Sequence, residues 1–157
     1  MRMQSDDGTA RNWQEALSYS ESLEFAGYDY WRLPSTRELQ SILDYTHSPS
    51  TDGLPAINSL FSCSQITAED GSTDYPFYWT GTTHIKFNYY GDAAAYVCFG
   101  TAFGYMSTLG GWIDVHGAGG QRSDPKAGDP EAYPYGHGPQ GDAVRIYHHV
   151  RCVRNAF

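Results

Sequence analysis

The chain of 157 residues has few cysteines and no long hydrophobic run. Cys63, Cys98 and Cys152 leave at least one thiol unpaired in a monomer, and no Cys-x-x-Cys pair is present. This pattern is compatible with free core thiols or with one disulfide that involves Cys152. No apolar run approaches the length of a membrane span, and the polar start of the chain lacks the apolar region of a secretory signal. We therefore expect no membrane span. The sequence leaves open whether the chain is intracellular or trimmed of a leader or anchor.

Basic residues are also scarce, because 10 Lys and Arg stand against 18 Asp and Glu, which gives a formal net charge of −8. This balance argues against a nucleic-acid or anionic-membrane partner, and mildly against a heparin-like ligand unless basic side chains cluster on one face. Charged residues make up only 18%, and 13 Tyr and 4 Trp are present, so this is not the composition of a disordered chain. The length fits one core, and we predict a polar tail over residues 1–11 and a single domain over 12–157.

The run from Trp31 to Leu39 is the most informative stretch for structure. Pro34 is excluded from the interior of a helix but is tolerated just before one. Ser35 and Glu38 have the spacing of a capping box, in which two side chains satisfy the first free amides of a helix. The run therefore predicts a short extended piece, a tight corner and a capped helix.

Asn12 and Glu15 have the same capping-box spacing, and Gly27 is placed to end the helix that they begin. Later runs rich in aromatic and β-branched residues predict strands. In chain order we expect helices over 12–25 and 36–45, a surface excursion over 46–76, strands over 77–80, 95–99 and 103–106, a long loop over 110–142 and a final strand over 144–153. This order predicts an α+β fold, with two helices packed on short antiparallel sheets joined by long loops.

The stretch from Asp114 to Pro130 mixes carboxylates, glycines and one histidine. Calcium takes six to eight oxygen ligands, and Asp114, Gln121, Asp124 and Asp129 are the candidate donors. Their spacing is not that of an EF-hand. The alternative is a metal-free, glycine-rich loop held by Asx turns and Arg–Asp pairs. We therefore expect no cofactor, or at most a structural calcium ion.

Six histidines raise the question of a transition-metal site, but no two lie four residues apart on a predicted helix. They are His47, His84, His116, His137, His148 and His149. The neighbours His148 and His149 are predicted on opposite faces of the final strand. Nucleophilic chemistry by cysteine needs a thiolate beside a base, and Cys152 lies in a predicted core strand. We expect no catalytic residue, no metal site of this kind and no enzyme activity.

From His84 onward, tyrosine and small polar residues recur at positions that we predict to be exposed. Tyrosine supplies a large amphipathic contact area at low entropic cost, and Ser, Gly and Asn supply adaptable polar contacts, as in a paratope. The alternative is that the tyrosines pack on a sheet face and the small residues form turns. On the first interpretation the candidate ligand-binding residues are His84, Asn88, Tyr89, Tyr90, Thr101, Phe103, Ser107, Leu109, Tyr147, His148 and His149.

Three motifs, in order, resemble those of one bacterial family. They are Trp31-Arg32-Leu33-Pro34-Ser35 with Glu38-Leu39, then Tyr78-Trp79-Thr80-Gly81-Thr82-Thr83, and finally Val150-Arg151-Cys152-Val153-Arg154. Over about residues 12–154 the chain is similar to the family that includes the C-terminal domain of a Legionella collagen-like adhesin. The resemblance implies a C-type-lectin-like fold of the formylglycine-generating-enzyme type and a secreted or cell-surface location. It does not carry that enzyme's activity, because the active-site cysteines have no mapped counterpart here.

The candidate binding residues also resemble those of the variable proteins of diversity-generating retroelements, which display a variable C-terminal region on a C-type-lectin-like fold. Mutagenesis at adenines turns asparagine codons into codons for Tyr, His, Asp and Ser, and Thr101, His148 and His149 depart from the usual family residues. We therefore hypothesise a non-enzymatic display module whose C-terminal half binds a protein or cell-surface ligand. The alternative is a surface adhesin domain that binds polysaccharide or glycosaminoglycan.

Overall fold

The computed structural model describes residues 1–85 and 90–155 of the chain. Over these residues the fold is α+β, with helices and small antiparallel sheets, as predicted. In chain order the elements are α1 (Trp13–Ser22), α2 (Thr36–Gln40), β1 (Ile66–Thr67), β2 (Thr73–Asp74), β3 (Phe77–His84), β4 (Ala93–Cys98), β5 (Phe103–Met106), η1 (Ser107–Leu109), β6 (Gly111–Asp114), β7 (Gln121–Pro125) and η2 (Pro130–Ala132). No helix within the described ranges is long and apolar enough to cross a membrane.

Both predicted capping boxes are confirmed. Asn12 accepts from the amide of Glu15 at 2.9 Å, and the Glu15 carboxylate accepts from the amide of Asn12 at 2.9 Å. The same reciprocal pair joins Ser35 and Glu38 at the start of α2. Both helices end earlier than predicted. α1 stops at Ser22 because the next residue is extended, and α2 gives way to a turn at its C-terminus.

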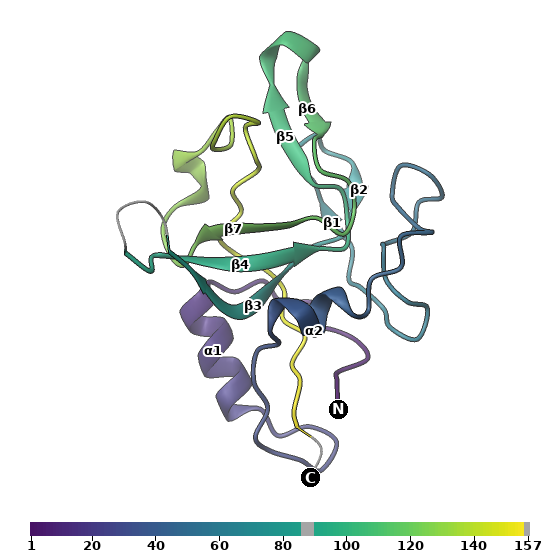
Figure 1. Cartoon of the computed structure of the whole chain (residues 1–157), viewed down its shortest axis with the longest axis vertical. Coiled ribbons are helices and arrows are strands. Elements are labelled where there is room, and N and C mark those ends of the chain that lie inside the picture. Colours follow the sequence, from purple (N-terminus) through teal and green to yellow (C-terminus); the bar gives the residue numbers. More distant parts are fainter. Residues whose placement is uncertain (86–89, 156–157) are drawn as a thin grey trace.

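The main sheet has three strands in the order β3-β4-β7, with antiparallel pairing throughout. Figure 1 shows α1 and α2 on one side of this sheet and the β5–β6 hairpin projecting from the other. All six residues of the central strand β4 are buried. Strands β6 and β7 lie inside the long loop that we predict over 110–142. That part of the prediction is wrong, because β7 is held by pairing with β4 and carries almost no apolar pattern of its own.

The predicted final strand over 144–153 is also wrong. The segment makes only isolated bridges, to Arg11 through His148, to Tyr78 through His149 and to Arg32 through Val153. In Figure 1 this segment (yellow) passes the sheet and runs to the end of the molecule where the helices lie. Residues 148–153 are all buried, so their side chains are covered on every side and period-2 exposure does not arise.

The first eleven residues pack against the domain, although we predict a polar tail there. Met3 is buried, and its amide donates to the carbonyl of Cys152 at 3.0 Å. Arg2 forms a bridge with Val153, and Ser5 forms one with Ser62. The N-terminal segment is therefore part of the folded unit, held by long-range contacts that local polarity does not reveal.

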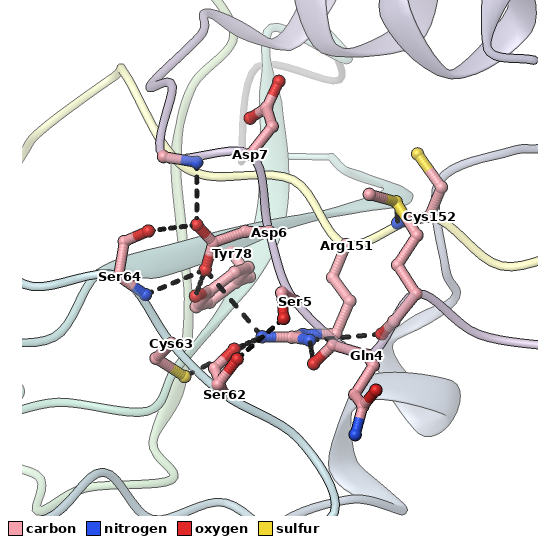
Figure 2. Close-up of polar contacts among 12 residues, drawn as sticks. Gln4, Ser5, Asp6, Asp7, Ser62, Cys63, Ser64, Tyr78, Arg151 and Cys152 are labelled. Atoms are coloured by element: carbon pink, nitrogen blue, oxygen red, sulfur yellow. Dashed lines mark hydrogen bonds and ion pairs between the residues drawn. The ribbon is translucent and has the colours of Figure 1, made fainter. Parts of the chain in front are cut away.

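A buried guanidinium joins the N-terminal and C-terminal segments. Figure 2 shows Arg151 between the 3–6 segment and the 62–64 loop. Its Nη1 donates to the carbonyls of Met3 at 3.1 Å and Gln4 at 2.6 Å, and its Nη2 donates to Ser62 at 2.5 Å. The Asp6 carboxylate lies 3.9 Å away, and both side chains are 1% exposed.

The Asp6 carboxylate is held by hydrogen bonds from four groups. Burial alone would raise the pKa of Asp6, but hydrogen bonds from Ser64, Tyr78 and the amide of Gly8 outweigh burial and lower it. Asp6 is therefore ionised at neutral pH and partly balances the positive charge of Arg151.

His148 lies in the core among aromatic rings. Its ring centroid is 4.1 Å from that of Trp79, 4.9 Å from Tyr96 and 5.6 Å from Phe77. Nε2 of His148 lies 3.0 Å from Asp124 Oδ2, but neither ring nitrogen makes a hydrogen bond with good geometry. Burial lowers the pKa of His148 despite the nearby carboxylate, so the ring is neutral at pH 7.

We predict that Arg151→Met destabilises the domain by about 3–5 kcal/mol, because the substitution leaves the carbonyls of Met3 and Ser62 without their donor and removes the positive charge that partly balances Asp6. Chemical denaturation measures the loss. Arg37→Met, at an exposed position of α2, is the matched control and should change stability by less than about 0.5 kcal/mol. A loss below about 1 kcal/mol in Arg151→Met would show that other contacts hold the two segments together.

A second prediction concerns pH. The unfolded chain takes up a proton at His148 near its ordinary pKa of 6.5, whereas the folded state resists this proton. The contribution of neutral His148 to stability is therefore complete above pH 6.5 and is lost as pH falls from there towards the lower folded-state pKa. His149 acts in the same direction. Denaturation between pH 5 and 8 should give a shallower pH dependence in His148→Gln than in the wild type, and identical slopes would contradict this account.

Candidate functional site

The predicted ligand-binding residues do not form one surface in the described part of the chain. Six of them lie at three separate places, namely the β3–β4 end of the sheet (His84, Tyr90), the tip of the β5–β6 hairpin (Ser107, Leu109) and a pocket lined by the C-terminal segment (Tyr147, His149). Figure 1 separates the β3–β4 end from the hairpin tip clearly. Asn88 and Tyr89 fall outside the described residues. The broad surface expected from composition is therefore not assembled here.

Four of these residues are buried, so the exposure that we predict for them is wrong. The exposed fractions are 9% for Thr101, 7% for Phe103, 1% for His148 and 5% for His149. The amide of Thr101 donates to the buried carboxylate of Asp74 at 3.0 and 3.1 Å. Phe103 begins β5 and packs in the small apolar cluster at the base of the hairpin. Of these four buried residues, only His149 lines the pocket.

The candidate calcium ligands are not brought together. Asp114 accepts from the amide of Gly117 at 2.8 Å, and Asp129 accepts from the amide of Glu131 at 2.9 Å, so each closes its own turn. Asp124 is buried and accepts backbone amides from a different segment. Among residues 1–85 and 90–155, no group of three or more His, Cys, Asp or Glu is placed to hold a metal ion. The turns at Asp114 and Asp129 agree with the Asx turns of the alternative, and Arg122 Nε lies 3.3 Å from Asp142, an aspartate outside the stretch.

A pocket of about 290 Å³ opens where the β1–β2 hairpin, the start of β3 and the 145–149 segment meet. Its lining residues are Ala10, Ile66, Thr67, Ala68, Glu69, Pro76, Phe77, Arg145, Tyr147 and His149. The volume is at the lower end of the range of about 300–1,000 Å³ for small-molecule sites. A mainly apolar lining with a few polar groups is also typical of such sites.

An ion pair forms the polar part of this lining. Arg145 donates from Nε to Glu69 Oε1 at 2.6 Å and from Nη2 to Oε2 at 2.8 Å, a two-point contact that fixes the plane of the guanidinium. The same guanidinium lies over the ring of Phe77, with its carbon 3.7 Å from the ring centroid. Because Glu69 neutralises Arg145, the pocket offers polar groups without a net charge from this pair.

The backbone next to Arg145 adopts an unusual conformation. Ile146 has φ of 61°, in the left-handed region that β-branched residues seldom occupy. Asp124 Oδ2 accepts the amides of Arg145 at 2.8 Å and Ile146 at 3.0 Å, which holds this turn. The Ile146 side chain is buried, and the next residue, Tyr147, is 44% exposed at the pocket. Strain of this kind tends to occur where a side chain must be presented in one orientation.

His149 supplies a second polar group to the pocket. Its amide donates to the carbonyl of Phe77 at 3.0 Å, and its carbonyl accepts from the amide of Trp79 at 3.1 Å, so β3 fixes its backbone. Within the described ranges, neither ring nitrogen of His149 has a hydrogen-bond partner. Burial lowers the pKa of His149, so the imidazole is neutral at pH 7 and offers one donor and one acceptor nitrogen.

The cysteines offer no reactive thiolate. All three are free, which excludes the disulfide alternative and confirms the free-thiol interpretation. Burial raises the pKa of Cys98 and of Cys152 to about 12, and it also raises the pKa of Cys63. These thiols are therefore protonated at neutral pH, where a nucleophile would have to be a thiolate.

Sequence reasoning found Tyr147 and His149 but missed most of the pocket. Arg145 stands in no local motif, and Glu69, its partner, lies 76 residues away from it in the chain. The apolar lining comes from Ile66 and Ala68, in a stretch that reads as an irregular surface excursion. No local pattern marks any of these residues as neighbours of Tyr147.

Comparison with known proteins gives one match. The model of the Lcl C-terminal domain family matches residues 1–112, which include seven of the ten pocket-lining residues but not the 145–149 segment. No curated protein and no solved structure matches the chain significantly. The family match covers more than two thirds of the 157 residues and includes α1, α2 and β1 to β5. The chain therefore belongs to the Lcl C-terminal domain family.

Proposed function

We propose that this domain is a non-enzymatic binding module that binds a sugar unit of a neutral polysaccharide in the pocket beside Tyr147. The observation that carries this proposal is the combination of an exposed tyrosine with the internally neutralised Arg145–Glu69 pair in one small pocket. An aromatic ring presents an apolar face to the C–H groups of a sugar, and planar polar side chains hydrogen-bond its hydroxyl groups. This proposal is the polysaccharide-binding adhesin alternative of the sequence analysis, with the ligand restricted to neutral saccharides.

Charge supports the choice of a neutral ligand. The chain has a formal net charge of −8, and the one arginine in the pocket lining is already paired with a carboxylate. A sulphated or carboxylated polymer would have to compete with Glu69 for Arg145 and would meet a long-range repulsion. Family membership supports a surface or binding role.

Two further assignments from the sequence are also proposals. The absence of enzyme activity is supported by three protonated, largely buried thiols. The C-type-lectin-like fold is supported by two early helices, short antiparallel strands and long connecting loops.

We predict that the domain binds neutral oligosaccharides on a glycan array, and that Tyr147→Ala weakens the binding about tenfold, because the substitution removes the aromatic surface at the pocket. Tyr30→Ala is the matched control, since Tyr30 is also exposed but does not line the pocket. Binding should change little between low and moderate salt. Binding confined to sulphated glycans, with steep salt dependence, or equal loss in both variants would contradict the proposal.

Retroelement-diversified display is the second candidate. Five of the residues that we associate with a variable surface are exposed, namely His84, Tyr90, Ser107, Leu109 and Tyr147. Burial of Thr101, His148 and His149 weighs against variation at those three positions, because most substitutions there would disturb the core.

The gene neighbourhood tests this second candidate. Display by this route requires a reverse transcriptase gene and a near-copy of the 3′ coding region, with mismatches at template adenines. We expect such mismatches, if the repeat exists, in codons for exposed residues such as Ser107 and Tyr147 and not in the codon for His148. The lack of any template repeat would remove this candidate and leave the polysaccharide proposal standing.

A further inference from the structure

Strand β6 leaves one edge of the β5–β6 hairpin without a partner strand. The other edge of the hairpin is covered, because the amide of Tyr105 donates to the carbonyl of Gly141 at 2.8 Å and the carbonyl of Phe103 accepts from the amide of Ala143 at 2.9 Å. In the described part of the chain, β5 is the only strand that pairs with β6. The hairpin also projects away from the main sheet (Figure 1).

The register of the hairpin identifies the backbone groups that are free at this edge. Residues of an antiparallel strand alternate between facing the partner strand and facing away from it. Tyr105 and Phe103 face away from β6, because both bond to residues 141–143. Their partners across the hairpin are Trp112 and Asp114, which therefore face away from β5. The N–H and C=O groups of these two residues point outwards and make no hydrogen bond to the described residues.

Features that protect exposed edges in other proteins are missing from β6. Natural edge strands carry lysine, proline or a bulge that discourages pairing with another chain. The strand is Gly111-Trp112-Ile113-Asp114, in regular register with β5, so it has no lysine, no proline and no bulge. Trp112 and Ile113 are partly exposed. Free backbone groups beside apolar side chains favour the addition of a further strand.

We propose that β6 pairs with β6 of a second copy of this chain, antiparallel and about a two-fold axis at Ile113. This register places Trp112 of each copy opposite Asp114 of the other, so that the outward groups of both strands meet. Each such pair exchanges two backbone hydrogen bonds, which gives about four bonds in the dimer. The register also keeps the two Asp114 carboxylates from lying opposite each other, which matters in a chain with a net charge of −8.

Other registers and other occupants match less well. An axis at Asp114 places the two carboxylates opposite each other, and an axis at Trp112 places Asp114 opposite Gly110, which lies outside the strand in the left-handed conformation. A disordered segment of another protein would have to lose chain entropy on pairing. A second copy supplies a strand that β5 already holds in place.

The dimer carries two copies of the pocket. Trp112 packs against the apolar cluster that contains Ala68, a residue of the pocket lining. A polysaccharide with repeated units can then bind both pockets and gain from the second contact. This consequence depends on the proposed saccharide binding, whereas the dimer itself does not.

Sedimentation and amide hydrogen exchange of the full chain, from about 10 μM to 1 mM, test the proposal. The edge is short beside a standard interface of about 1,200–2,000 Å², so we expect a dissociation constant of about 0.1–1 mM. Exchange at Trp112 and Asp114 should then slow about two- to fivefold at the highest concentration. Exchange at Ile113 should not change, because its N–H faces β5 in the monomer.

Ile113→Lys places two lysines opposite each other across the axis and should weaken association at least about tenfold. Ile85→Lys is the matched control, because Ile85 is 60% exposed directly after β3, and it should leave association unchanged. A wild-type domain that is monomeric at about 1 mM, or a dimer that survives Ile113→Lys, overturns the proposal. A dimer without slower exchange at Trp112 and Asp114 also overturns it, and this comparison needs only the unaltered protein.

Discussion

The fold depends on a guanidinium that has almost no contact with water. Arg151 is fully buried, and its hydrogen bonds reach Met3, Gln4 and Ser62, which come from two distant parts of the chain. A buried charge without partners is very unfavourable, so the N-terminal segment and the 62–64 loop are constrained to supply carbonyl groups at defined places. Asp6 adds a negative charge 3.9 Å away and is itself held by Ser64 and Tyr78 (Figure 2). Asp6 and Arg151 are thereby fixed beside Tyr78 of β3.

This constraint determines how the candidate site is built. Arg151 is fixed at one end of the 145–151 segment, and Asp124 holds the amides of Arg145 and Ile146 at the other. The chain between these two points must therefore pass β3 in one register. His148 therefore enters the aromatic core, while Tyr147 and His149 lie at the pocket. The left-handed conformation of Ile146 costs about 1–3 kcal/mol, which the two hydrogen bonds to Asp124 help to offset. The pocket is the space left where this segment meets the β1–β2 hairpin.

Features coded by neighbouring residues could be predicted, and features coded by distant ones could not. Both capping boxes follow from residues three apart, and the bounds of β5 follow from a short local pattern. β7 has no such pattern, because pairing with β4 stabilises it. The alternation at 144–153 is present in the sequence, but residues 148–153 are all buried, so the alternation does not mark an exposed face there. Glu69 and Arg145 meet across 76 residues, so no spacing rule identifies them, although Tyr147 and His149 were recognisable by residue type.

The central claim is that the pocket, and not the hairpin tip or the β3–β4 end, is where this domain binds its ligand. Amide chemical-shift mapping of the 15N-labelled domain, titrated with the strongest-binding neutral oligosaccharide, tests it most directly. The account predicts that the largest shifts fall on residues 66–69, 77 and 145–149, with small changes at 107–109. Shifts concentrated at 107–109 or at 84 and 90, with 145–149 unchanged, would contradict it and would place the binding surface elsewhere on the fold.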